Sequence, residues 1–78
     1  DGEYEFIEAE IIESSELINK SLKESSLPKE IRIGAILRKD DIIIPKSNFI
    51  FEKKDLVVFL TKRDQLRKVE NLFRVSSF

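Results

Sequence analysis

The residue types that most often carry catalysis or bind transition metals are missing from this chain. It contains neither cysteine nor histidine, so it has no thiol nucleophile, no imidazole base, and no thiolate or imidazole ligand for a metal ion. Without cysteine, no disulfide can stabilise the fold. Any site must therefore be built from carboxylates, hydroxyls, amines and guanidinium groups, and we expect a protein that is not an enzyme.

The densest acidic set lies near the N-terminus. Its members are Glu3, Glu5, Glu8, Glu10, Glu13 and Glu16. Glu8 and Glu10 are two positions apart, so on a strand they share a face, where carboxylates can hold a hard cation such as Ca²⁺ together with further oxygen ligands. No Asp-x-Asp-x-Asp-Gly loop accompanies them. We favour the simpler interpretation, the solvated outer face of an edge strand.

Two other charged groups have ordinary structural explanations. Asp40 and Asp41 are adjacent in a predicted hairpin tip, where aspartates form turns and point apart. A basic cluster near the C-terminus could contact phosphates or an acidic partner, but Asp64 and Glu70 lie within it and weaken its field. We favour a solvated helix face for this cluster, which consists of Lys62, Arg63, Arg67, Lys68 and Arg74.

The stronger candidates for binding are cationic and apolar residues that flank the predicted strands. They are Pro28, Arg32, Ile33, Arg38, Pro45 and Lys46. The cations can pair with phosphate, and the prolines and isoleucine offer flat apolar surfaces for a ring. This combination indicates an anionic, ring-bearing ligand at a subunit seam. The alternative is that both prolines end structural elements and the basic residues face solvent.

Length and charge limit the class of protein. A chain of 78 residues forms one domain, residues 1–78, with a marginal core that an oligomer or a tether would support. Its 14 basic and 15 acidic residues nearly cancel, which gives no basic stripe for nucleic acid. No apolar run approaches the roughly 20 residues of a membrane span, and no signal-peptide pattern opens the chain. We expect a cytoplasmic domain cut from a longer protein.

The first half of the chain predicts a strand and a short helix. Residues 4–12 alternate, with Ile7, Ala9 and Ile11 on one face. Leu17 and Ile18 follow as apolar anchors before a turn at Asn19. Ser21 and Glu24 then form a capping-box pattern, so a short helix should begin at Ser21 and end before Pro28.

The second half predicts a hairpin, a central strand and a helix. Ile31, Ile33, Ala35 and Leu37 should share one strand face, with Gly34 leaving a gap on the other. A turn at residues 39–41 leads to a strand over 42–44, and residues 49–51 are a candidate extra strand.

Residues 56–60 are apolar without alternation, which predicts a central strand covered on both faces. Thr61 and Asp64 form a variant capping box before a helix whose apolar positions are Leu66, Val69, Leu72 and Phe73. The whole pattern predicts an α+β fold: a small, mostly antiparallel sheet with a short helix after the first strand, a central hairpin and a C-terminal helix.

The order and spacing of these pieces resemble the C-terminal domain of the TrkA regulators of potassium conductance. The matching residues are Leu27-Pro28-Lys29, Ile31-Arg32-Ile33-Gly34-Ala35-Ile36, Arg38, Ile43-Ile44-Pro45, and Asp55 with Val57-Val58-Phe59. The resemblance covers about residues 4–75. It implies a non-catalytic regulatory domain that forms a homodimer and needs no cofactor of its own. In some family members this domain binds a regulatory nucleotide such as cyclic di-AMP at the dimer interface.

The resemblance also implies partners. In such proteins the domain follows a dinucleotide-binding domain, whose Gly-x-Gly-x-x-Gly fingerprint this chain lacks. It acts on a membrane potassium transporter or channel subunit, and so lies at the inner face of the cell membrane through that partner. Two alternatives stay open: a ligand-binding domain appended to another cation transporter or antiporter, and a structural dimerisation module without a ligand.

Three positions depart from the family pattern. The family often has glycine where this chain has Asn19, Lys39-Asp40 and Lys54. Asn and Asp tolerate the left-handed backbone conformation that glycine usually adopts, whereas lysine fits it less well. We therefore expect the turn that contains Lys54 to be the poorest match.

Overall fold

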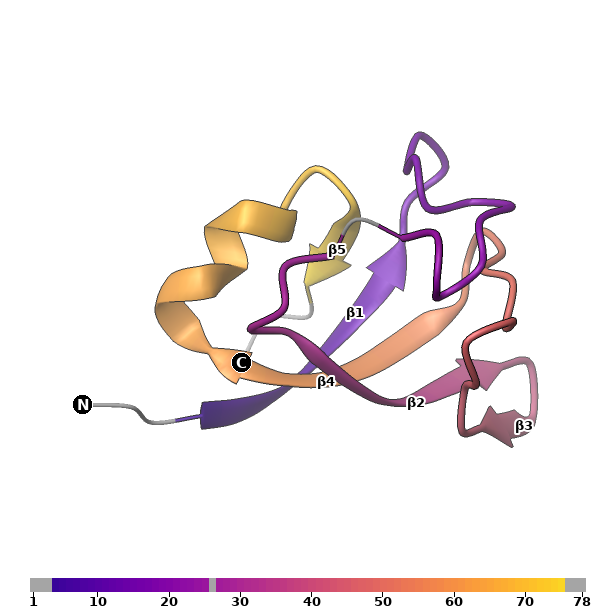
Figure 1. The fold of residues 1–78 in the computed structure, drawn as a ribbon, viewed down its shortest axis with the longest axis horizontal. Coiled ribbons are helices and arrows are strands. Elements are labelled where there is room, and N and C mark those ends of the chain that lie inside the picture. Colours follow the sequence, from indigo (N-terminus) through magenta and orange to yellow (C-terminus); the bar gives the residue numbers. More distant parts are fainter. Residues whose placement is uncertain (1–3, 26, 76–78) are drawn as a thin grey trace.

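A single antiparallel sheet organises this protein. The computed structural model describes residues 4–25 and 27–75, so Glu3 of the acidic set lies outside the described residues. The strands follow the order β3-β2-β4-β1-β5 across the sheet, and every pairing is antiparallel (Figure 1). The elements are β1 (Tyr4–Ile11), β2 (Arg32–Arg38), β3 (Asp41–Ile43), β4 (Leu56–Lys62), the 3-10 helix η1 (Arg63–Val69) and β5 (Phe73–Val75).

The predicted α+β class was wrong. Within residues 4–25 and 27–75, η1 is the only helix and it is of the 3-10 type. Both predicted helices therefore fail, the short one after the first strand and the C-terminal one. The protein is a mostly antiparallel β fold in which irregular loops supply most of the second layer.

The segment predicted as the first helix forms its capping box but not the helix. The Ser21 backbone N–H donates to Glu24 Oε1 at 3.0 Å, and the Glu24 N–H donates to Ser21 Oγ at 3.1 Å. The neighbouring N–H groups of Leu22 and Lys23 donate across to the carbonyl oxygens of Phe49 and Ser47. A helix this short is marginal in isolation, and pairing with the second loop replaces it.

The C-terminal segment returns the chain from one end of β1 to the other. Lys62 pairs with Tyr4 at one end of β1, and Phe73 pairs with Ile11 at the other. The connection therefore runs back along seven residues of β1, roughly 23 Å. Seven of the residues in between form η1, which rises about 2.0 Å per residue, and residues 70–72 complete the return to β5.

The predicted start of this helix was also wrong. Thr61 is fully buried inside β4, and its hydroxyl has no hydrogen-bond partner among the described residues. Lys62 is the N-cap, without a side-chain cap. The apolar positions do enter the core, but Phe73 belongs to β5, a strand that the sequence analysis missed.

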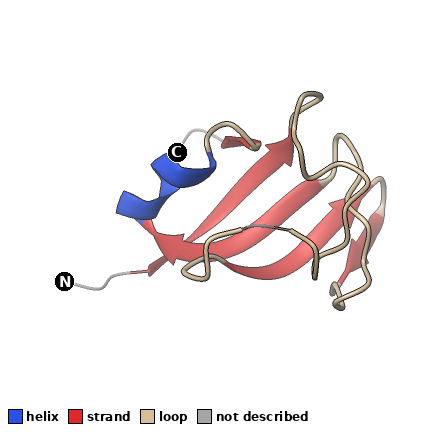
Figure 2. Cartoon of the chain, turned by 45° about the horizontal axis from the view of Figure 1, so that its top comes forward, coloured by secondary structure: helices blue, strands red, loops and turns tan. Residues whose placement is uncertain are grey.

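The core lies between one face of the sheet and a layer made of η1 and two loops (Figure 2). Ile7, Ala9 and Ile11 on β1 are at most 1% exposed, which confirms the predicted inward face. Beside them, β4 turns Val57 and Phe59 inward. Central placement of β4 is confirmed, but its other face stays half-exposed within this chain.

Gly34 changes which side of β2 faces the core. The β2–β4 register shifts between Ile33 and Ala35, so Gly34 is the extra residue of a β-bulge. After the bulge, Ile36 is fully buried and Ala35 moves to the opposite face. The predicted face of Ile31, Ile33, Ala35 and Leu37 was therefore wrong beyond Gly34. A Cβ at position 34 would meet only the Val58 carbonyl oxygen, at 3.6 Å.

The hairpin between β2 and β3 is confirmed, with Leu37 opposite Ile42. The predicted extra strand over residues 49–51 is reduced to one bridge between Ile50 and Ser21.

Three non-glycine residues adopt a left-handed backbone conformation. They are Asn19 (φ 70°), Lys39 (φ 56°) and Lys54 (φ 72°). These are the positions at which the resemblance favours glycine, and here side chains with a Cβ carry the steric cost of the left-handed backbone. A left-handed conformation costs a residue with a Cβ about 1–2 kcal/mol.

We predict that Lys54→Gly raises the free energy of unfolding by roughly 0.5–1 kcal/mol, since relief of this strain exceeds the conformational entropy cost of glycine. Thermal unfolding should then shift upward by a few degrees. The matched control is Lys53→Gly, which changes the same side chain at a position without positive φ and should lower the melting temperature. If both substitutions lower it, strain at Lys54 does not limit stability.

Candidate functional site

Arg38, one of the six predicted binding residues, is held by the chain itself. At the end of β2, its Nε donates to Asp55 Oδ1 at 2.8 Å and its Nη2 donates to Asp55 Oδ2 at 2.7 Å. Nη2 also donates to the Ile50 carbonyl oxygen at 2.9 Å, and Nη1 lies 3.3 Å from Glu52 Oε2. The guanidinium stands 4.8 Å from the centre of the Phe49 ring. Arg38 thus joins the hairpin end to the loop that precedes β4.

The Asp55 carboxylate is the buried partner in this network. Its residue is only 1% exposed, and Oδ2 also accepts the Glu52 backbone N–H at 2.9 Å, closing the turn around Lys54. A buried carboxylate without a partner is costly, whereas a bidentate guanidinium satisfies both oxygens. The hydrogen bonds to Asp55 raise the pKa of Arg38 above its usual value. These contacts are structural, and a ligand role for Arg38 stays a prediction.

The other five predicted residues lie apart from this network. Arg32 is exposed at the start of β2 and makes no hydrogen bond or ion pair with a described residue, while Ile33 follows it half-buried. Pro28 is half-buried in the loop before β2. Pro45 and Lys46 come just after β3, along the same edge of the sheet. The structure does not gather the five into one site: Arg32 pairs with Leu60 and Ile33 pairs with the inward-facing Phe59, so these two side chains lie on opposite faces of β2.

The acidic residues of β1 do not form a metal centre in the described part of the chain. No group of three or more carboxylates there is placed to hold an ion. Glu8 is exposed, and Glu5 instead accepts two hydrogen bonds from Arg63, at 2.9 and 2.6 Å. These hydrogen bonds raise the pKa of Arg63. The strand itself lies between β4 and β5, so the predicted edge position was wrong.

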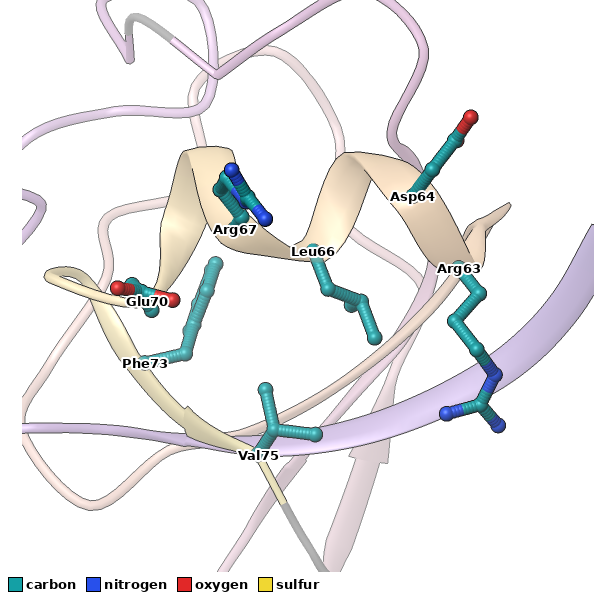
Figure 3. Close-up of a pocket in the computed structure, with 7 residues that line it drawn as sticks. All are labelled: Arg63, Asp64, Leu66, Arg67, Glu70, Phe73 and Val75. Atoms are coloured by element: carbon teal, nitrogen blue, oxygen red, sulfur yellow. The ribbon is translucent and has the colours of Figure 1, made fainter.

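A hollow of about 700 Å³ between η1 and β5 went unnoticed in the sequence (Figure 3). Arg67 and Glu70 lie at its rim, and Leu66, Phe73 and Val75 supply its apolar surface. Part of the predicted basic cluster lines it, but acidic residues interrupt the positive charge and Arg63 is paired with Glu5. Nothing in the residue pattern could have revealed this hollow, because β5 had not been predicted.

A smaller hollow of about 260 Å³ lies beside the Arg38–Asp55 pair. Lys39, Lys53, Lys54 and Glu52 line it together with the pair, so its charge is mixed. None of the helices in residues 4–25 and 27–75 is long and apolar enough to cross a membrane.

The sequence of this chain is similar to one family of proteins. The TrkA-C domain family matches residues 6–74. The Trk system potassium uptake protein TrkA of Azorhizobium caulinodans is 40% identical over 76 residues, which are 97% of this chain and 17% of that protein. A TrkA homolog of Archaeoglobus fulgidus is 34% identical over 82% of this chain, and TrkA of Haemophilus influenzae is 34% identical over 86%. In these two relatives the match spans 15% of the length.

We predict that Arg38→Ala destabilises the domain by about 3 kcal/mol, because it leaves the Asp55 carboxylate buried without a cation. Chemical denaturation measures this change. The control is Glu5→Gln, which weakens the comparable bidentate pair with Arg63 at an exposed position and should change stability far less. Equal losses in the two variants would show that burial of Asp55 does not set the strength of the pair.

Proposed function

This chain belongs to the TrkA-C domain family, and from that membership we propose that it is a non-catalytic regulatory domain of a potassium uptake protein. The observation that carries the proposal is the 40% identity to a Trk potassium uptake protein across 97% of the chain. The lack of cysteine and histidine and the mixed charge of the largest described hollow support a role in binding or coupling. The domain acts from the cytoplasm, as part of a longer protein that also carries a dinucleotide-binding domain.

The proposed partners are a second copy of the domain and a membrane potassium transporter or channel subunit. The half-exposed apolar face of β4 supports dimerisation, because a small domain gains stability by burying such surface. Movement of one copy against the other would then be passed to the membrane partner.

The proposed ligand is an anionic nucleotide such as cyclic di-AMP, bound at the dimer seam. Arg32 supports this proposal because its guanidinium is exposed and unpaired within the described chain. Ile33 adjoins it on β2, Lys46 adds a second exposed cation, and the half-buried rings of Pro28 and Pro45 offer apolar surfaces for a base. Arg38 would hold the nearby hairpin in place.

The role in potassium uptake is tested by grafting this domain into the A. caulinodans protein in place of the 76-residue segment it matches. We predict that the graft supports growth of a strain lacking that protein in low-potassium medium. A graft carrying Arg38→Ala is the control, since its destabilised domain should support growth less well. If the intact graft folds, is expressed and yet fails, the domain serves another transporter.

The ligand is tested by thermal unfolding with cyclic di-AMP, ATP and inorganic phosphate. We expect cyclic di-AMP to raise the free energy of unfolding by about 2.7 kcal/mol at a hundredfold excess over Kd. Arg32→Ala should weaken this response, and Arg67→Ala, which removes an exposed arginine on η1, should not. If no anion stabilises an intact dimer, the domain is a mechanical coupler without a ligand.

A further inference from the structure

One edge of the sheet is only partly paired. The strand β5 lies beside β1 at Ala9–Ile11 only. From Tyr4 to Glu8, β1 has β4 on one side and no strand of residues 4–25 and 27–75 on the other. An unpaired strand edge presents free N–H and C=O groups to any extended chain that approaches it.

The direction of the backbone groups in β1 follows from the hydrogen bonds at its end. The Ile11 N–H donates to the Asp55 carbonyl oxygen, on the β4 side. The Ile12 N–H donates to the Leu72 carbonyl oxygen, on the β5 side. Because the backbone groups of successive residues in a strand point to opposite sides, the even-numbered residues of β1 direct their N–H and C=O groups toward β5.

Two of these even-numbered residues are left without a neighbouring strand. Glu10 pairs with Arg74, but Phe6 and Glu8 lie beyond Val75, the last residue of β5. No described residue bonds their edge-facing N–H and C=O groups. Donor and acceptor groups at alternate residues match the main chain of one further antiparallel strand.

The hollow of about 700 Å³ lies in line with this open edge (Figure 3). One end of its lining is Val75, which pairs with Ala9, and the other is Arg63, which donates two hydrogen bonds to Glu5. A strand that continued the line of β5 from Ala9 to Glu5 would be about 14 Å long. Leu66 and Val75 are half-buried in the hollow and are available to pack against its inward side chains.

We propose that the open edge of β1 and this hollow bind an extended segment of a partner protein, which adds a strand to the sheet in line with β5. Main-chain hydrogen bonds to Phe6 and Glu8 hold the segment, and its alternate side chains give specificity. The site is on the β5 side of the sheet, whereas the residues proposed to bind a nucleotide are on or beside β2 and β3. The two proposals are therefore independent.

The side chains of β1 indicate the chemistry of the partner. The register of β5, continued, places successive partner residues opposite Glu8, Ile7 and Phe6. Glu8 is exposed without a described partner, so a basic residue fits opposite it, as Arg74 does opposite Glu10. Ile7 faces the core, so an apolar residue fits opposite it. Phe6 is 75% exposed, and an aromatic residue fits opposite it.

The probe is the synthetic peptide acetyl-Lys-Val-Tyr-Thr-Val-amide, whose Lys, first Val and Tyr follow this pattern. Amide hydrogen exchange, followed by NMR, measures its binding to the native chain. We expect the peptide to slow exchange at Phe6 and Glu8 but not at Ile7, whose N–H faces β4. Methylation of the Tyr nitrogen, which donates to Phe6, should weaken binding about tenfold. Methylation of the first Val nitrogen, which points away from β1, should not.

A charge exchange tests the register of the added strand. Glu8→Lys should weaken binding of the peptide about threefold or more, because it places like charges opposite each other. A peptide with Glu in place of Lys should recover the lost affinity. The control is Glu16→Lys, which makes the same change at an exposed residue after β1 and should have no effect.

Other results overturn the proposal. If exchange at Phe6 and Glu8 is slow in the native chain and becomes fast when residues 76–78 are deleted, the chain itself occupies the edge. If their protection rises with protein concentration in the absence of peptide, a second copy occupies it. If the peptide binds equally well with either nitrogen methylated, or gives no protection at all, β1 does not accept an added strand.

Discussion

Burial of the Asp55 carboxylate is the constraint on which the hairpin end of this domain depends. The carboxylate is 1% exposed, and such a group is tolerated only with a well-placed partner. Arg38 supplies it, and in doing so holds the last residue of β2 against the first turn before β4. The same guanidinium also restricts the neighbouring loop. It donates a hydrogen bond to the Ile50 carbonyl oxygen and lies over the Phe49 ring. One ion pair therefore connects the end of β2 to the loop that precedes β4.

The antiparallel sheet explains both the core and the proposed interface. Each of its central strands presents alternate residues to opposite sides, and η1 with two loops covers only one side. The chain is too short to add a second cover, yet β4 is apolar on both sides. Because the core covers only one face of the sheet, the apolar side chains on the other face of β4 form a surface that a partner can bury.

Family membership and physical chemistry agree most closely in the turns. Asn19, Lys39 and Lys54 all have positive φ, at the positions where the family favours glycine. The turn around Lys54 persists because Asp55 accepts the Glu52 backbone N–H, so hydrogen bonding offsets the steric cost of the lysine. A match in backbone geometry can thus outlast the loss of the residue type that makes it easiest.

The sequence by itself determined the family, the strand character of residues 4–11 and 56–60, and the β2–β3 hairpin, because strand alternation and turn chemistry are local signals. The six residues proposed to bind a ligand came from residue type, and the structure does not place them on one face: Arg32 pairs with Leu60, whereas Ile33 pairs with the inward-facing Phe59. Tertiary structure alone decided the rest. The bulge at Gly34 turned Ile36 inward because β2 had to pair with β4, and pairing with β1 made residues 73–75 a strand. Arg38 pairs with Asp55, which lies 17 positions further along the sequence. Tertiary structure decided this pair because a local pattern indicates which face of an element a residue takes, but not which distant residue it will contact.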